Sequence, residues 1–213
     1  MARRNSETGP ARRGRPRAYD TQAALKRAAD EFWHTGYAGT SLDNIAAATG
    51  MNPPSLYAAF GNKRGIYLEA LARYWQISLA ATREALAEDR PLREALMLAY
   101  EAALSLYFSG KGRARGCFVM GTAVTEAVDD ADIRNSIAAG LRMIDADFQA
   151  RLRLAQGKGE LKRDADPAAL AMLASATMQT IGIRARAGVS RSELREIAQK
   201  AVGVICGCQG SAG

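Results

Sequence analysis

Histidine and cysteine are scarce in this chain of 213 residues. It contains one histidine, His34, and three cysteines, Cys117, Cys206 and Cys208. A closed metal site usually needs about four ligands of these types, and the last two cysteines lie too close together for an easy disulfide framework. We therefore expect no metal, no cofactor and reduced thiols.

Long apolar runs and recognisable catalytic sets are also missing. No apolar run approaches the roughly 20 residues needed to span a bilayer, and the Arg-rich N-terminus has no apolar signal core. We therefore expect no membrane partner and a cytoplasmic location. The sequence offers no Ser/His/Asp set, and residues 110–116, although basic and rich in glycine, lack Walker spacing. These absences argue against an enzyme.

Helical periodicity covers most of the chain. Apolar residues recur every three or four positions, their share of 48% can build a large core, and no segment has the pattern of a strand. Pro, Gly, Ser and Asp residues at the ends of these segments mark the boundaries of helices. We predict an all-α protein of about nine helices, at residues 20–35, 40–50, 52–60, 63–88, 91–109, 117–127 and 130–157, and two that start near Asp166 and Ser190.

The net charge of +7 is concentrated at the N-terminus. Six arginines against one glutamate lie in the first 17 residues, so residues 1–18 are predicted to be a disordered basic arm that attracts phosphates. Within it, Arg13, Arg15 and Arg17 resemble the core of an AT-hook, which inserts arginines into a narrow A·T-rich minor groove. The alternative is a solvated tail that only raises nonspecific affinity.

The segment that begins at Thr40 has the pattern of a helix-turn-helix. Thr40 or Ser41 can cap the first helix, with Asp43 completing a capping box. Gly50 can adopt the left-handed backbone that ends this helix, and Asn52 can cap a second helix that tolerates proline in its first turn. A longer third helix follows. This pattern predicts DNA binding.

Here the sequence resembles the TetR family of one-component bacterial repressors. The resemblance covers about 45 residues, and the positions that carry it are Gly36, Tyr37, Thr40, Ser41, Ile45, Ala46, Gly50, Leu56, Tyr57, Phe60 and Lys63. It implies a helix-turn-helix DNA-binding domain at residues 19–64, a helical ligand-binding and dimerisation domain at residues 65–213, and a place in the bacterial cytosol or nucleoid. It also implies repression of transcription that a small molecule relieves.

The resemblance carries over to individual DNA contacts. Ser41 and Tyr57 fall where family members contact phosphates, and Lys63 falls where the next helix touches the DNA backbone. Such contacts fix register without reading sequence. The alternatives are that Tyr57 is a packed aromatic residue and that Lys63 is a solvated lysine, since a cation at a helix N-terminus opposes the helix dipole.

The start of the second helix is predicted to face the bases. It consists of Asn52, Pro53, Pro54 and Ser55. A proline can only press its ring against a thymine methyl or a sugar, whereas the Ser55 hydroxyl can hydrogen-bond a base edge. Alanines stand at positions 58 and 59, where bulkier residues are common in the family. We therefore expect DNA shape and the basic arm to supply part of the specificity.

Ligand contacts in the second domain are predicted from residues that could line an apolar cavity. The candidates are Tyr74, Tyr100, Cys117, Met120, Phe148 and Met172. Cys117 follows two arginines at a predicted helix start, where the helix dipole and the guanidinium groups would stabilise a thiolate that reacts with oxidants or electrophiles. The alternative is that these side chains, Cys117 included, are plain core.

The expected function is that of a ligand-responsive repressor. It would bind a (pseudo)palindromic operator in double-stranded DNA as a homodimer joined by the last two helices, and a small molecule or modification of Cys117 would release it. The alternative for those helices is packing within one subunit. Two other functions compete, an architectural DNA-binding protein without a sensor and an all-helical enzyme.

Overall fold

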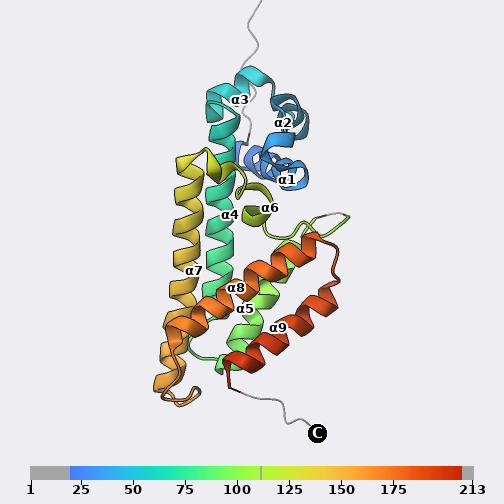
Figure 1. Cartoon of the computed structure of the whole chain (residues 1–213). Helices are drawn as coiled ribbons and strands as arrows, with labels where there is room; N and C mark the ends of the chain where they lie inside the picture. Colours follow the sequence, from blue (N-terminus) through green and yellow to red (C-terminus); the bar gives the residue numbers. More distant parts are fainter. Residues whose placement is uncertain (1–19, 111, 208–213) are drawn as a thin grey trace, which may run out of the picture.

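The computed structural model describes residues 20–110 and 112–207, and this part of the chain confirms the all-α prediction (Figure 1). It contains nine α-helices, one 3-10 helix and no strand. The predicted arm and Cys208 lie outside the described residues. The elements are α1 (Thr21–Gly39), α2 (Leu42–Thr49), α3 (Pro53–Phe60), α4 (Lys63–Ala85), α5 (Leu92–Tyr107), α6 (Phe118–Thr122), η1 (Glu126–Val128), α7 (Ala131–Gly157), α8 (Pro167–Arg186) and α9 (Arg191–Ile205).

Three local details differ from the sequence prediction. Gly36 breaks the helical geometry of α1 with a φ of 80°, but the chain makes one further turn before α2. The capping box of α2 joins Ser41 to Asn44 and does not involve Asp43, because Ser41 and not Thr40 is the N-cap. The helix predicted over residues 117–127 is interrupted, since α6 ends at Thr122 and only a 3-10 turn follows.

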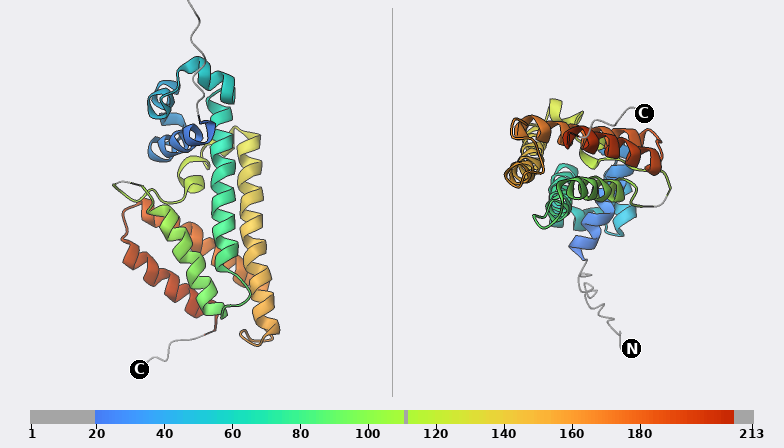
Figure 2. Two further views of the ribbon diagram at one scale, coloured as in Figure 1. Left: turned by 180° about the vertical axis from the view of Figure 1, so that it is seen from behind. Right: turned by 90° about the horizontal axis from the view of Figure 1, so that it is seen from below.

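The helices are arranged around the long α4 (Figures 1 and 2). Helices α1, α2 and α3 gather at one end, α7 runs along α4, and α5, α8 and α9 pack together at the other end. The short α6 lies between α1 and α8 and touches α4 as well. The buried apolar residues form one cluster that continues from α1 through α4 into α8 and α9. A shift of α1 or α4 would therefore change the packing both of the helix-turn-helix and of the helices at the other end.

The close packing of α4 against α7 depends on a glycine. A Cβ atom on Gly140 would lie 2.2 Å from Cε2 of the Trp75 indole ring. Ion pairs join the same two helices near the two ends of α4, from Arg64 to Asp130 and from Arg83 to Asp147, the latter at 2.9 Å. Within the described ranges, no helix is both long and apolar enough to cross a bilayer.

Candidate nucleic-acid interface and ligand cavity

The turn between α2 and α3 is built as the sequence predicts. Gly50 has a φ of 70°, the left-handed conformation that side chains with a Cβ disfavour, and it ends α2. The Thr49 hydroxyl donates to the Ile45 carbonyl at 2.7 Å and accepts from the Met51 amide at 3.3 Å. Ile45 and Leu56 are buried between the two helices and the rest of the core. The turn is therefore stabilised by hydrogen bonds within the chain and by the packing of the two helices that flank it.

The start of α3 leaves an exposed but chemically sparse surface. The Asn52 side chain caps the helix by accepting a hydrogen bond from the Ser55 amide at 2.9 Å, so this oxygen is already engaged. Pro53 and Pro54 are exposed, Ser55 is half-buried, and Tyr57 is 51% exposed. Two exposed alanines follow. The geometry thus leaves the Tyr57 phenol and the proline rings accessible to a partner.

Ser41 and Lys63 both have structural contacts of their own. The Ser41 hydroxyl accepts from the Asn44 amide at 3.1 Å, and the Asn44 side chain accepts from the Ser41 amide at 2.9 Å. The Lys63 ammonium donates to the carbonyls of Tyr37 and Thr40 at 3.0 and 2.9 Å and lies 4.3 Å from the centre of the Tyr37 ring. Since an ammonium has three donors, one remains for another acceptor.

Arg64, beside Lys63, joins the start of α4 to the start of α7. Its guanidinium donates to both carboxylate oxygens of Asp130 and to Asp132. The hydrogen bond from Arg64 lowers the pKa of Asp130 to about 2. Asp130 also caps α7 through the amides of Asp132 and Ile133. No local sequence pattern predicts this connection, because Arg64 and Asp130 are 66 residues apart.

Trp33 of α1 makes a second connection to the body of the protein. Its indole N–H donates to the Gly116 carbonyl at 3.1 Å, and its ring packs edge-on against Tyr74 and Phe118 with centroids 5.5 Å away. The Arg115 guanidinium lies 4.1 Å above the Trp33 ring. Helical periodicity predicts only that Trp33 lies on the inward face of its helix. The contact with residues 115–118 could not be found without the tertiary structure.

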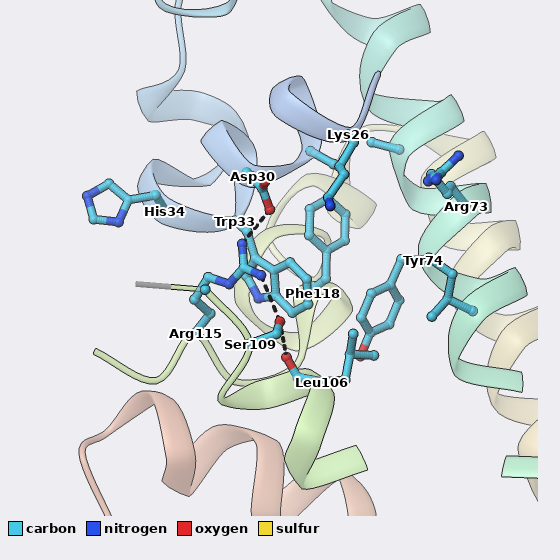
Figure 3. Close-up of a pocket in the computed structure, with 14 residues that line it drawn as sticks. Lys26, Asp30, Trp33, His34, Arg73, Tyr74, Leu106, Ser109, Arg115 and Phe118 are labelled. Atoms are coloured by element: carbon cyan, nitrogen blue, oxygen red, sulfur yellow. Dashed lines mark hydrogen bonds and ion pairs between the residues drawn. The ribbon is translucent and has the colours of Figure 1, made fainter. Parts of the chain in front are cut away.

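A cavity of about 540 Å³ opens beside Trp33 (Figure 3). Its walls come from α1, α4 and the end of α5, together with residues just before and at the start of α6. The lining residues are Lys26, Ala29, Asp30, Trp33, His34, Ala70, Arg73, Tyr74, Ile77, Leu106, Ser109, Gly110, Arg115 and Phe118. The volume and the aromatic walls are typical of a small-molecule site.

Of the six predicted ligand residues, only Tyr74 lines this cavity. Tyr100 and Phe148 are fully buried in the core, where the Tyr100 hydroxyl donates to the Ala174 carbonyl at 3.1 Å. Met172 is 68% exposed on α8. Met120 and Cys117 line a separate hollow of about 290 Å³ beside α8. The predicted residues therefore do not converge on one site.

The prediction of a stabilised thiolate at Cys117 is wrong. Cys117 is only 5% exposed, and burial raises the pKa of its thiol. The Tyr74 hydroxyl donates to Sγ at 3.2 Å and lowers the pKa, but it does not outweigh burial. The Arg115 guanidinium, which was expected to help, is instead paired with Asp30 at 2.6 Å. The described residues also contain no group of His, Cys, Asp and Glu suited to a metal ion.

Comparisons with known proteins agree with this arrangement. Residues 24–70 match the family described as "Bacterial regulatory proteins, tetR family", and residues 94–201 match "Tetracyclin repressor-like, C-terminal domain". The two matches together cover the helix-turn-helix and most of the helical body.

Individual relatives support the same assignment. The chain is 36% identical over 188 residues to the HTH-type transcriptional repressor ComR of Escherichia coli K12, a match that spans 87% of this chain and 89% of ComR. It is 29% identical over 159 residues to the transcriptional regulator YezE of Bacillus subtilis 168, across 74% of this chain and 81% of YezE. Among solved structures, a cysteine mutant of the TetR family regulator CifR complexed with 26-bp operator DNA superposes with a TM-score of 0.79 and 32% identity, over 88% of this chain and 98% of CifR. The chain belongs to the TetR family of bacterial regulatory proteins, and it is a DNA-binding transcriptional regulator and not an enzyme.

Proposed function

We propose that this protein represses transcription by binding a (pseudo)palindromic operator as a homodimer, and that a small molecule releases it from DNA. The observation that carries the proposal is the pair of connections at Trp33 and Arg64, which tie the helix-turn-helix to the body beside a ligand-sized cavity. ComR is named a repressor, and the CifR structure contains operator DNA. Both facts support the DNA-bound form proposed here.

The DNA contacts that we propose follow the exposure of α2 and α3. Tyr57 and the remaining donor of Lys63 would contact phosphates, Ser41 would do so from its cap, and the arginines of the N-terminal arm would add contacts along the duplex. Base reading would be left to Ser55 and to the proline rings at the start of α3. An interface with so few base-reading groups depends strongly on phosphate contacts and hence on salt.

A dimer is the assembly that a palindromic operator requires, since two recognition helices must reach grooves about 34 Å apart or a multiple of that distance. The surface of α8 and α9 suits this role because it exposes Met172, Leu173, Ile183 and Val204. Exposed apolar side chains that share one surface commonly mark a protein interface. We therefore place the subunit contact on α8 and α9.

Modification of Cys117 is a second proposed route of release. Cys117 lines the hollow that also contains Met120 and Gly182, and this hollow is the route that we propose for a small electrophile. The raised pKa means that attack would be slow until α6 opens. Oxidant treatment should therefore weaken operator binding of the parent protein but not of Cys117→Ser. Equal loss in both proteins would exclude this route.

The proposed function is tested by selecting bound fragments from a genomic DNA library and measuring their affinities at several salt concentrations. Tyr57→Phe should weaken binding to specific and nonspecific DNA by a similar factor, roughly tenfold to a hundredfold for one lost hydrogen bond to a charged group. Ser136→Ala, on α7 and outside α2, α3 and the proposed subunit contact, is the matched loss of a hydroxyl and should leave operator affinity unchanged. A protein that selects no fragment above background would contradict the proposal.

Repeating the affinity measurement with small molecules added distinguishes a regulator from an architectural protein. An architectural protein would bind DNA with no response to any small molecule. A regulator must bind its effector with unequal affinity in the DNA-bound and released forms. Release of a selected operator by a compound from a metabolite collection is the expected result.

A further inference from the structure

We propose that the cavity between α1, α4 and the end of α5 binds an organic anion with an aromatic body, of the aryl carboxylate class. This inference deepens the proposed function and rests on it only for the regulatory consequence. The site lies at the junction of the helix-turn-helix and the body, and Trp33, Tyr74 and Phe118 pack against one another to form its aromatic wall (Figure 3).

The aromatic preference follows from these walls. Trp33 and Tyr74 meet edge to face at an interplanar angle of 89°, and Tyr74 and Phe118 are stacked at 29°. Leu106 and Ile77 complete the apolar surface. Flat aromatic rings bury much apolar area against such walls and find both edge and face contacts there. A cavity of about 540 Å³ has room for a two-ring ligand.

The charge of the lining favours an anion. Lys26, Arg73 and Arg115 line the cavity, whereas Asp30 is its one lining carboxylate, and Asp30 is already paired with Arg115. Arg73 donates at 2.6 Å to Gln22, which is neutral and leaves the charge uncompensated. Lys26 has no ion pair within the described part of the chain. Two positive charges at the cavity are therefore left without a counterion.

Arg115 is held in place for recognition. Its guanidinium lies over the Trp33 ring, a Cβ atom on Gly110 would come within 3.2 Å of its Cζ and Nε, and its two terminal nitrogens donate to Asp30 and Ser109 at 2.6 and 2.8 Å. Nε is buried and has no hydrogen-bond partner in the described residues. Nε would meet a ligand only if the side chain shifted, but the fixed guanidinium brings a positive charge to the cavity wall, and guanidinium groups are common partners of carboxylates.

An anion in this cavity would act on the connection that orients α1. A carboxylate near Arg115 competes with Asp30, which belongs to α1, for the same guanidinium. The ligand body would meanwhile press against Trp33, whose indole hydrogen bond to Gly116 is another of the links between α1 and the body. Both effects loosen α1 from the body, so bound ligand should lower operator affinity.

The test uses 2-naphthoate as the probe and 2-naphthamide as its uncharged counterpart, with the full chain in a calorimeter and no DNA present. We expect naphthoate to bind, the amide to bind at least tenfold more weakly, and the Lys26→Met, Arg73→Met double variant to weaken naphthoate binding about tenfold. Lys200→Met, at an exposed lysine on α9, is the matched control and should bind as the parent does.

Several results would overturn the site. The first is the absence of binding heat from naphthoate at millimolar concentration. The second is equal affinity of the parent protein for naphthoate and naphthamide. The third is equal affinity of the parent protein and the double variant for naphthoate. Operator affinity is measured separately, with and without naphthoate. If naphthoate binds but operator affinity does not change, the proposed regulatory effect of the ligand is refuted. If the protein binds no operator, the proposed function is refuted. The calorimetric result still shows in that case whether the cavity binds an aryl carboxylate.

Discussion

Replacing Trp33 by phenylalanine tests the connection between α1 and the segment before α6. Both tryptophans of the chain are 7% exposed, so Trp33→Phe and Trp75→Phe remove the same atoms from equally buried positions. Apart from the Arg115 guanidinium that lies over the Trp33 ring, they differ in their hydrogen bonds. The Trp33 indole N–H donates to Gly116 at 3.1 Å, whereas the Trp75 indole nitrogen is buried without a partner in the described residues.

The magnitudes follow from this difference. Loss of part of a buried ring costs about 1–2 kcal/mol in either variant, a fraction of the cost of full truncation to alanine. Trp33→Phe also loses a hydrogen bond and leaves the buried Gly116 carbonyl without its donor, which costs about 1–3 kcal/mol more. Trp75→Phe removes a donor that has no partner and carries no such cost. Trp33→Phe should thus be less stable than Trp75→Phe by about 2 kcal/mol.

Urea unfolding followed by far-ultraviolet circular dichroism is the appropriate assay, because both variants change the fluorescence. The free energies of unfolding are compared by linear extrapolation at one protein concentration, since a dimer makes the midpoint depend on concentration. Equal free energies for the two variants would refute the reasoning. That result would mean that the Gly116 hydrogen bond adds nothing beyond the packing of the ring.

Three further predictions follow from individual contacts. Gly140→Ala should destabilise the protein by about 1–3 kcal/mol in the same unfolding assay, because its Cβ would meet the Trp75 ring at 2.2 Å. An unchanged midpoint would mean that α4 and α7 can separate freely. The pKa of Asp130 is lowered to about 2 by Arg64, so its contribution to stability is complete above the ordinary pKa of 3.8 and is lost as the pH falls toward 2. Asp130→Asn should therefore reduce the loss of stability between pH 4 and pH 2, and parallel acid curves would contradict this. Burial raises the pKa of the Cys117 thiol, so iodoacetamide at pH 8 should label Cys117 slowly in the native protein and quickly in urea, in a variant whose other cysteines are serine. Equal labelling rates would contradict the burial.

Part of the candidate site was predictable because it depends on local chemistry. A serine before α2, a glycine after it and Asn52 before two prolines each act within about four residues, so the sequence identified the helix-turn-helix and most of its caps. The choice between Thr40 and Ser41 as the cap was not predictable. It depends on Thr40 being buried, where its hydroxyl donates to the Gly36 carbonyl.

The ligand residues show the limit of sequence patterns. Periodicity places Tyr74, Tyr100 and Phe148 on inward faces, and all three are buried. Whether an inward face borders a cavity or solid core depends on how several helices meet. Only the structure shows that Tyr74 borders the cavity while the other two are packed in the core.

By itself, the sequence determined the helices, the helix-turn-helix, and the family resemblance, because periodicity, caps and turns are properties of neighbouring residues. The tertiary structure decided which charges are compensated. It paired Arg115 with Asp30 and Arg64 with Asp130, buried the Cys117 thiol, and gave Lys63 carbonyl acceptors. These outcomes depend on distances between residues far apart in the chain, and electrostatic free energies change steeply with distance and burial.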